Sequence, residues 1–441
     1  MPVHDRMRAQ ARLILDNHEG AAAYPAPDRW DEIDDFDYLY REYTILALEQ
    51  DADRVAAALR QTFNDTGYGD VPEGDARQIQ SERAAVPGRN GRLVRLTVPP
   101  TPMLVPELVT RLDAELGPGV AKPEHKVYLC PNICPATEPI EVPAHADPVP
   151  FPGLGADGAG TSWAGNDGYG VSVSIVDTGL TPGAAASHTW LTGVQGVAED
   201  PYTTSSSGET VLAAYAGHGT FGAGVLRCVA PKASVFVERA FDIAGADYET
   251  RLAASLEDAL DRDPDILVFT FAAATHRDES LHTFDELYDR RISRMKGLVV
   301  LAPAGNESTS QPRWPAAHPG VIAVGALAAN GRQRAHWSNY GRWVDVYAPG
   351  EDLVNAFPEG TYVCTEPPNV GERRQFGGMA MWSGTSFSTP LVAGLIAARM
   401  SQTGQNAQQA WDSLQRFACG QSIPGVGPVL YPRQAGRESG H

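Results

Sequence analysis

The 441-residue chain holds five cysteines, an odd number that cannot all pair within one chain. A disulfide framework is therefore not expected. Buried or free thiols are the favoured interpretation, with a redox or metal pair at Cys130 and Cys134 as the alternative. No stretch reaches the roughly 18 apolar residues of a membrane-spanning helix. Residues 1–16 lack the uninterrupted apolar core of a signal peptide, which predicts a cytoplasmic protein with no membrane partner.

Positive charge is scarce. The chain has 35 lysines and arginines against 54 acidic residues, which gives a net charge of -19. No basic patch with interleaved aromatic side chains is present in the sequence. Nucleic acid and anionic membranes are therefore not expected partners.

A serine-containing motif, Gly-Thr-Ser-Phe-Ser-Thr-Pro at residues 384–390, precedes a run of small and apolar residues. The run predicts a helix with Ser386 at its mouth, where backbone NH groups and the helix dipole stabilise negative charge. Pro390 is tolerated in the first turn, and Gly394 allows close packing against a neighbour. This is a suitable place for a nucleophile.

A serine needs a base and a group that orients the base. Residues 171–177 form a β-branched run that ends in Asp177, which predicts a buried strand with a carboxylate at its carboxyl end. His218 lies in Gly-His-Gly-Thr, at the start of a predicted helix. Asn306 follows the apolar strand 297–304, and its amide is suited to stabilising an oxyanion together with the backbone NH of Ser386.

These motifs, in this order, resemble those of the subtilisin-like serine proteases: Asp-Thr-Gly at 177–179, Gly-His-Gly-Thr at 217–220, Ala-Gly-Asn at 304–306 and the serine motif at 384–390. Segments 314–326 and 337–350 are also similar to that family. The resemblance covers roughly residues 160 to 420, and four ordered motifs are far more specific than any one.

The resemblance implies a serine endopeptidase that acts on protein or peptide substrates. Ser386 is the implied nucleophile, His218 the base, Asp177 the residue that orients it, and Asn306 the oxyanion donor. The substrate-binding residues that it implies are Phe271, Ala272, Ala273, Gly305 and Glu307. No cofactor is required. Calcium is possible, but the loop that builds the commonest calcium site is absent.

The sequence departs from the family pattern at several positions. Phe221 replaces a second histidine behind His218, and residues 351–381 form an insertion that could be a flap or be clipped. The run Phe269-Thr-Phe-Ala-Ala-Ala274 stands where the family has a serine and glycines, which predicts a preference for small or medium apolar side chains before the scissile bond. Glu307 could instead favour a basic one.

The expected fold is α/β, a doubly wound and mostly parallel sheet flanked by helices, with a smaller N-terminal α+β domain. The predicted divisions are an extension (1–37), a propeptide-like domain (38–142), a linker (143–160), the catalytic domain (161–420) and a C-terminal tail (421–441). Strands are expected near 234–241, 265–271, 297–304 and 321–327, and helices near 248–260 and 281–295.

The patterns of the N-terminal domain predict a β-α-β-β-α-β order over residues 38–130 if residues 77–84 contribute a strand, and this order resembles the ferredoxin-like propeptide of the subtilisin-like proteases. Two roles stay open for it. As a propeptide it would inhibit the active site and be cut off between residues 142 and 160; as a permanent domain it would bind a partner or gate access.

Two other functions remain as alternatives. One is a catalytically silent, peptide-binding scaffold, and the other is a protease dedicated to a single precursor rather than a general degrader. The residues of the four motifs favour catalysis over the silent scaffold.

Overall fold

The computed structural model describes residues 4–25, 36–65, 79–83, 92–101, 103–129, 138–150, 167–205, 207–241 and 244–432. Cys130, Cys134 and positions 151–160 of the predicted linker lie outside the described residues. Cys228, Cys364 and Cys419 are free thiols.

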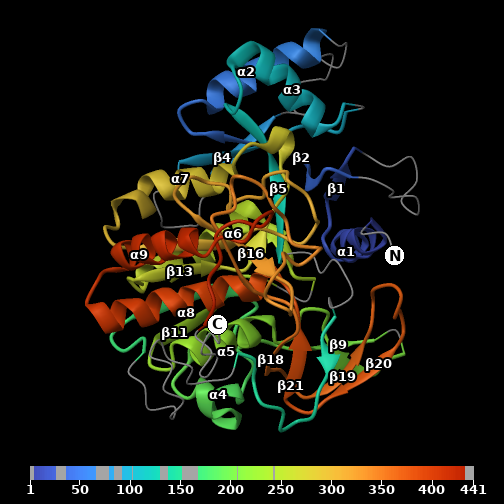
Figure 1. Cartoon of the computed structure of the whole chain (residues 1–441). Helices are drawn as coiled ribbons and strands as arrows, with labels where there is room; N and C mark the ends of the chain where they lie inside the picture. Colours follow the sequence, from blue (N-terminus) through green and yellow to red (C-terminus); the bar gives the residue numbers. More distant parts are fainter. Residues whose placement is uncertain are drawn as a thin grey trace.

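A parallel sheet forms the centre of the larger domain (Figure 1). Its strands, in spatial order, are β17 (Val346–Pro349), β16 (Ile322–Leu327), β15 (Val299–Pro303), β13 (Ile266–Phe269), β7 (Ser172–Asp177), β11 (Ser234–Arg239) and β8 (Gln195–Gly196). The chain builds from β7 to β11 on one side and then crosses to β13 on the other. Such a crossing places ligand sites beyond the carboxyl ends of the strands.

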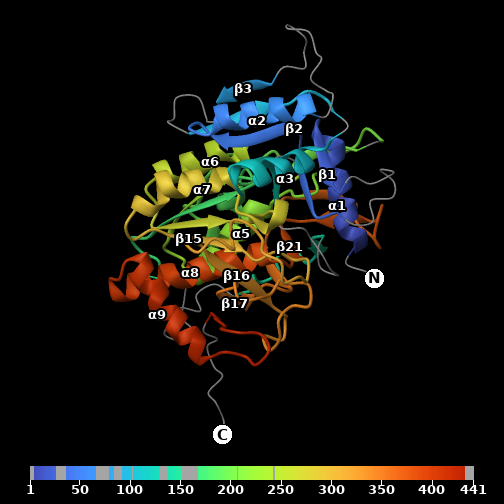
Figure 2. The ribbon, with the colours of Figure 1, turned by 90° about the horizontal axis from the view of Figure 1, so that it is seen from above.

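Helices cover both faces of this sheet, as Figure 2 shows. Helices α5 (His218–Val229), α8 (Thr385–Thr403) and α9 (Ala407–Gly420) lie on one face, and α6 (Glu249–Asp261) and α7 (His282–Arg290) on the other. Alternate residues of β15 therefore enter different cores: Val299 and Leu301 one, Val300 and Ala302 the other. The doubly wound, mostly parallel fold is confirmed.

Helix α8 packs closely on helix α5. A Cβ atom added to Gly394 of α8 would lie 2.9 Å from Cβ of Val229 in α5. Only a glycine therefore fits at this crossing, as the sequence predicts.

The N-terminal domain is an α+β unit, at the top of Figure 1. Its elements are β2 (Tyr38–Leu48), α2 (Ala52–Asp65), β3 (Gln80–Arg83), β4 (Leu93–Thr97), α3 (Val105–Leu116) and β5 (Ala121–Leu129). The strands pair antiparallel in the order β5-β2-β4-β3. This is the predicted β-α-β-β-α-β order. Helix α1 (His4–Asn17) and strand β1 (Ala21–Tyr24) precede the unit, and β1 pairs with β2.

Strand β5 belongs to both domains. Beyond its pairing with β2, it pairs antiparallel with β12 (Ala246–Tyr248) and β14 (Phe271–Ala272) of the larger domain. Every residue of β5 is buried. The two domains thus share one continuous strand.

The insertion at 351–381 is a set of strands: β18 (Leu353–Ala356), β19 (Gly360–Val363), β20 (Arg373–Phe376) and β21 (Met379–Trp382). One small sheet has the order β20-β19-β10-β9, with β9 (Tyr202–Thr204) and β10 (Thr210–Leu212). Another has the order β18-β21-β6, with β6 (Ile140–Glu141) contributed by the chain that follows β5, at the end of the predicted propeptide-like domain. Both lie at the lower right of Figure 1.

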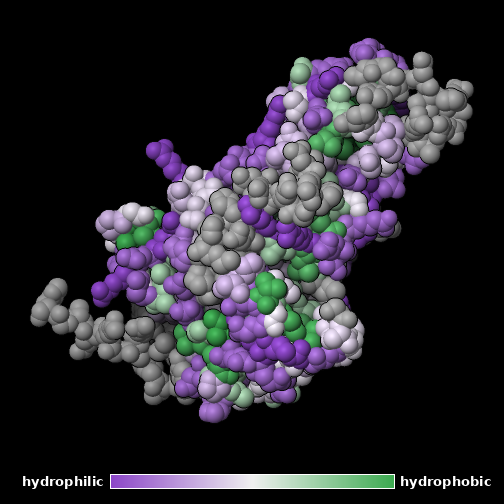
Figure 3. Space-filling model, turned by 90° about the vertical axis from the view of Figure 1, so that its right-hand side faces the viewer, coloured by the Kyte–Doolittle hydropathy of each residue, from purple (hydrophilic) through white to green (hydrophobic). Residues whose placement is uncertain are grey.

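The face in Figure 3 carries separate hydrophobic groups among hydrophilic ones. Among the helices of the described ranges, none has the length and apolar character needed to cross a membrane.

Candidate functional site

An acid and an imidazole meet at the edge of the central sheet. Asp177 is the last residue of β7, and His218 is the first residue of α5. Nδ1 of His218 lies 2.8 and 2.9 Å from the two carboxylate oxygens of Asp177. The backbone NH of Thr178 also donates to Oδ1 of Asp177, at 2.6 Å. The fully buried carboxylate thus fixes the proton of the imidazole on Nδ1 and leaves Nε2 as the basic atom.

The serine lies beside this pair. Ser386 is the second residue of α8, and the ring of the next residue, Phe387, lies 4.9 Å from the His218 ring. The Ser386 hydroxyl donates to the carbonyl oxygen of Thr270 at 3.0 Å. Within the described part of the chain it makes no hydrogen bond to His218. A change of the χ1 rotamer of Ser386 is the movement that redirects this hydroxyl.

Asn306 is tied to the start of the same helix. Its Oδ1 accepts hydrogen bonds from the backbone NH and the hydroxyl of Thr385, at 3.0 and 2.7 Å. Because an NH group can only donate, this end of the amide is the oxygen, and the NH2 end points the other way. Nδ2 lies 3.7 Å from the position that a Cβ atom would take on Gly384.

Three neighbouring strands position the carboxylate of Asp177, the carbonyl of Thr270 and the amide of Asn306. Asp177 ends β7, Thr270 follows β13, and Asn306 lies shortly after β15. Because these strands are adjacent and parallel, their carboxyl ends meet at one edge, where the N-termini of α5 and α8 also lie. The four residues that the motifs single out are therefore at one site.

The predicted substrate-binding strand is already paired with another strand of the chain. Phe271 and Ala272 form β14, which pairs with Leu129 and Tyr128 of β5. Ala273 exchanges two backbone hydrogen bonds with Trp314, at 2.8 and 2.9 Å. All three predicted residues are buried, so β5 fills the position that an added peptide strand would take.

Glu307 does not present a free charge. Its carboxylate lies 3.5 Å from Nε of the buried Arg313 and accepts a hydrogen bond from Asn339. Gly305, which precedes Asn306, has φ +96°, and a Cβ atom there would collide with Glu307 and Asn339. The glycine is therefore required where this ion pair passes beneath the Asn306 turn.

Glu199 is a further buried carboxylate at the site, and no motif marks it in the sequence. Its two oxygens accept the backbone NH of Gly217 at 2.9 and 3.1 Å, directly before His218. The hydroxyls of Thr181 and Thr178 also hydrogen-bond to it. Burial raises the pKa of Glu199 to about 7, although these hydrogen bonds lower it. Glu199 therefore fixes the turn that begins the histidine helix.

Replacing Glu199 with glutamine is expected to lower kcat roughly tenfold, because the NH2 end of the new amide cannot accept from Gly217 or Thr181. Below about pH 7 the native carboxyl holds a proton and likewise loses an acceptor site. The acid limb of the kcat profile should therefore be steeper in the native chain than in Glu199→Gln. Identical pH profiles for the two proteins would contradict this positioning role.

No group of three or more His, Cys, Asp or Glu side chains is placed to hold a metal ion in the ranges that the structure describes.

Residues 168–417, more than half of the chain, match the subtilase family, and the chain belongs to this family. Subtilisin NAT of Bacillus subtilis subsp. natto is 32% identical over 256 residues, which are 55% of this chain and 59% of that protein. Subtilisin of Bacillus pumilus is 32% identical over 257 residues, with 55% and 82% covered. Thermitase of Thermoactinomyces vulgaris is 28% identical over 279 residues, with 60% and 86% covered.

The chain spans less than two thirds of the length of the first of these relatives. Among solved structures, fervidolysin from Fervidobacterium pennivorans, described as a keratinolytic enzyme related to subtilisin, aligns with a TM-score of 0.54 at 19% identity. The alignment covers 89% of this chain and 60% of fervidolysin. At this identity the likeness is one of fold.

Proposed function

We propose that the chain is a serine endopeptidase that hydrolyses peptide bonds through Ser386, His218 and Asp177, with Asn306 in the oxyanion hole. The contact that carries the proposal is the pair of short distances from Asp177 to Nδ1 of His218, directly beside the serine helix. Membership of the subtilase family supports the same reaction class.

In this mechanism the Ser386 hydroxyl first turns from Thr270 to Nε2 of His218. Its oxygen bonds to the substrate carbonyl carbon while its proton passes to Nε2, and Asn306 donates to the resulting oxyanion. The C–N bond then breaks, and the proton moves from His218 to the leaving amine. Water repeats the two steps: its hydroxyl joins the acyl carbon, and Ser386 regains a proton.

A fluorophosphonate probe tests the nucleophile. We expect one covalent adduct, on Ser386, and none in Ser386→Ala. Because β5 fills the strand position beside the site, Leu129→Asp is a second variant: a charge at this fully buried position should release the strand and speed labelling. Absence of labelling in both the native chain and Leu129→Asp would favour the silent scaffold.

We further propose that the N-terminal domain inhibits the site in the same chain. Tyr128 of β5 pairs with Ala246 on one side and Ala272 on the other, so that β5 is the middle strand of three. Leu129, its last residue, pairs with Phe271, which directly follows the Thr270 carbonyl that holds the Ser386 hydroxyl. β5 therefore ends beside the nucleophile, as a bound peptide would.

Buried polar contacts join the two domains. Glu249 accepts from the backbone NH and Nδ1 of His125 at 3.0 and 3.1 Å, and from the NH of Thr283 at 2.9 Å. Burial alone would raise the pKa of Glu249, but these hydrogen bonds hold it below its usual value. The backbone NH of His276 donates to Nε2 of His125. The contact between the domains thus contains a buried polar network in addition to apolar surface.

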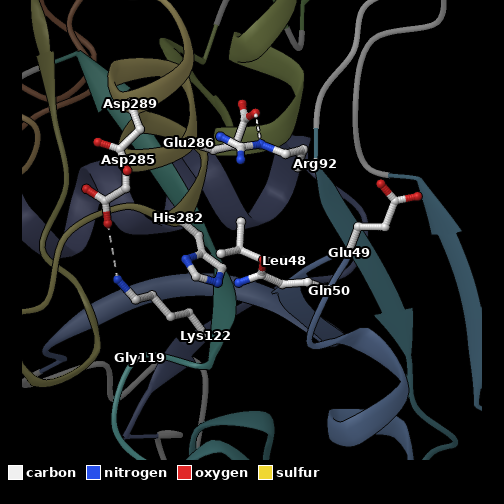
Figure 4. A pocket seen from close by; sticks show the side chains of 10 residues that line it. All are labelled: Leu48, Glu49, Gln50, Arg92, Gly119, Lys122, His282, Asp285, Glu286 and Asp289. Atoms are coloured by element: carbon white, nitrogen blue, oxygen red, sulfur yellow. Dashed lines mark ion pairs between the residues drawn. The ribbon is translucent and has the colours of Figure 1, made fainter. Parts of the chain in front are cut away.

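A cavity of about 580 Å³ lies between the domains, lined by the end of β2, the start of β5 and helix α7 (Figure 4). Two ion pairs cross it: Lys122 to Asp285 at 3.5 Å and Arg92 to Glu286 at 3.7 Å. His282 also lines it, and its Nε2 has no hydrogen-bond partner in the described structure.

Acidification is expected to loosen this contact. Burial lowers the pKa of both His276 and His282 from 6.5 to about 4, so the joined domains favour neutral imidazoles. His125 and Arg277 lower the pKa of His276 further. His125 and Lys122 do the same for His282, whereas Glu249 raises the pKa of His282. Separated domains would take up these protons near pH 6.5. The joined state therefore loses stability as the pH falls from 6.5 towards 4.

The measurement is amide exchange of β5 in Ser386→Ala protein, corrected for the intrinsic pH dependence. We expect protection to fall over this range. In the double variant His276→Asn, His282→Asn, protection should depend less on pH. Protection that is constant from pH 6.5 to 4 would refute the expectation.

The preference before the scissile bond stays a prediction. The ion pair with Arg313 removes the reason for Glu307 to favour a basic side chain, which leaves small or medium apolar residues as the proposed class.

A further inference from the structure

The insertion contacts an acidic segment, Glu138–Glu141, that follows β5 in the chain. The Glu138 side chain is directed into the insertion, and the residue is 5% exposed. Its Oε1 accepts the backbone NH groups of Thr365 and Glu366 at 2.6 and 3.2 Å, and the Tyr362 hydroxyl lies 3.3 Å away. Burying a carboxylate is costly unless donors satisfy it. Here the donors all come from the insertion.

The backbone of the same segment is held as well. Nη1 of Arg374 donates to the carbonyl oxygens of Glu138 and Pro139, at 3.5 and 2.9 Å. Ile140 and Glu141 pair with β21, and the NH of Gln375 donates to the Glu141 carboxylate. The insertion therefore binds this extended acidic segment through its side chain, its carbonyl groups and its strand pairing.

The groups around Glu138 keep their protons. Burial, and then the Glu138 carboxylate, raise the pKa of Cys364 to about 12 and move the pKa of Tyr362 well above its usual value. Both remain neutral donors across the physiological range, so the binding of Glu138 does not depend on their titration.

We propose that the insertion is a clamp for Glu138–Glu141, and that this segment stays with the catalytic domain when the N-terminal domain leaves. The inference rests on the proposed function, because it places the self-cleavage N-terminal to Glu138. There one C–N bond is hydrolysed, with the hydroxyl of water going to the acyl carbon and a proton to the new amine. A cut between 142 and 160, as the predicted linker suggests, would instead force the clamp to open and leave its buried donors unsatisfied.

Mass spectrometry of the full chain locates the cut. We expect the catalytic fragment of the native protein to begin upstream of Glu138 and Ser386→Ala to remain whole. A catalytic fragment that begins after Glu141 would overturn the clamp. A native chain that stays whole contradicts self-cleavage only, and amide exchange in Ser386→Ala then decides the clamp alone.

In that exchange experiment, adding Glu138→Ala should speed exchange at Thr365 and Glu366 roughly tenfold or more, the size expected when hydrogen bonds to a charged group are lost. Glu209→Ala is the matched control. Glu209 forms an exposed ion pair with Arg373 of β20, in the small sheet β20-β19-β10-β9, and none of its described contacts is to Glu138–Glu141. Equal exchange in the two variants would overturn the proposal.

Discussion

Replacing Asp177 with asparagine is expected to lower kcat by roughly 10⁴-fold. The backbone NH of Thr178 donates to Oδ1, which holds the amide oxygen of the new side chain at that place. The NH2 group then takes the position of Oδ2, 2.8 Å from Nδ1 of His218. Two donors cannot share this distance, so the imidazole proton moves to Nε2, and that atom can no longer accept the serine proton.

Steady-state hydrolysis of a peptide substrate measures the effect. Asp265→Asn serves as the control, because this carboxylate accepts from Ser172 at the opposite end of β7. We expect its kcat to stay within about twofold of the native value, as for most substitutions away from a site. A chain with Asp177→Asn that keeps a tenth of its activity would show that the carboxylate does not set the tautomer.

Replacing Asn306 with alanine is expected to reduce kcat by roughly 10² to 10³-fold with little change in KM, because its NH2 group is proposed to meet charge that exists only in the transition state. Alanine also removes Oδ1, which binds Thr385. Asn306→Asp keeps that acceptor, removes the donor and adds a charge at this buried position. We therefore expect both variants to lose kcat and stability, the alanine because Thr385 loses its acceptor and the aspartate because a carboxylate is buried.

Thermal unfolding and steady-state kinetics separate these effects. Asn330→Ala, at an exposed amide that accepts from Arg332, should alter neither. If Asn306→Asp kept native kcat, the oxyanion role would be wrong, and Asn306 would serve only to tie β15 to α8.

The sequence was sufficient for the elements that local patterns encode. The apolar runs before Asp177 and Asn306 predict strands whose carboxyl ends share an edge, and the structure has them as β7 and β15. The order of strands and helices in the N-terminal domain was likewise predictable. Apolar periodicity and glycine turns are properties of short sequence segments, so they can be recognised without knowing how the rest of the chain folds.

Long-range pairings were not predictable in this way. No local pattern indicates that Tyr128 lies between Ala246 and Ala272, or that Glu138 is buried by the insertion. Glu199 has no motif, and only its burial beneath Gly217 marks it. The bond from Ser386 to Thr270 depends on a side-chain rotamer, which the sequence does not specify.

Strand β5 belongs to the same chain as the two strands, β12 and β14, between which it lies, and this has a consequence for concentration. A separate inhibitor leaves its target as the solution is diluted, whereas a tethered strand keeps an effective concentration that chain connectivity sets. Occupancy of the edge beside Ser386 is therefore the same in a dilute and a crowded solution. Only a broken tether or a weakened contact would make it respond to the number of molecules present.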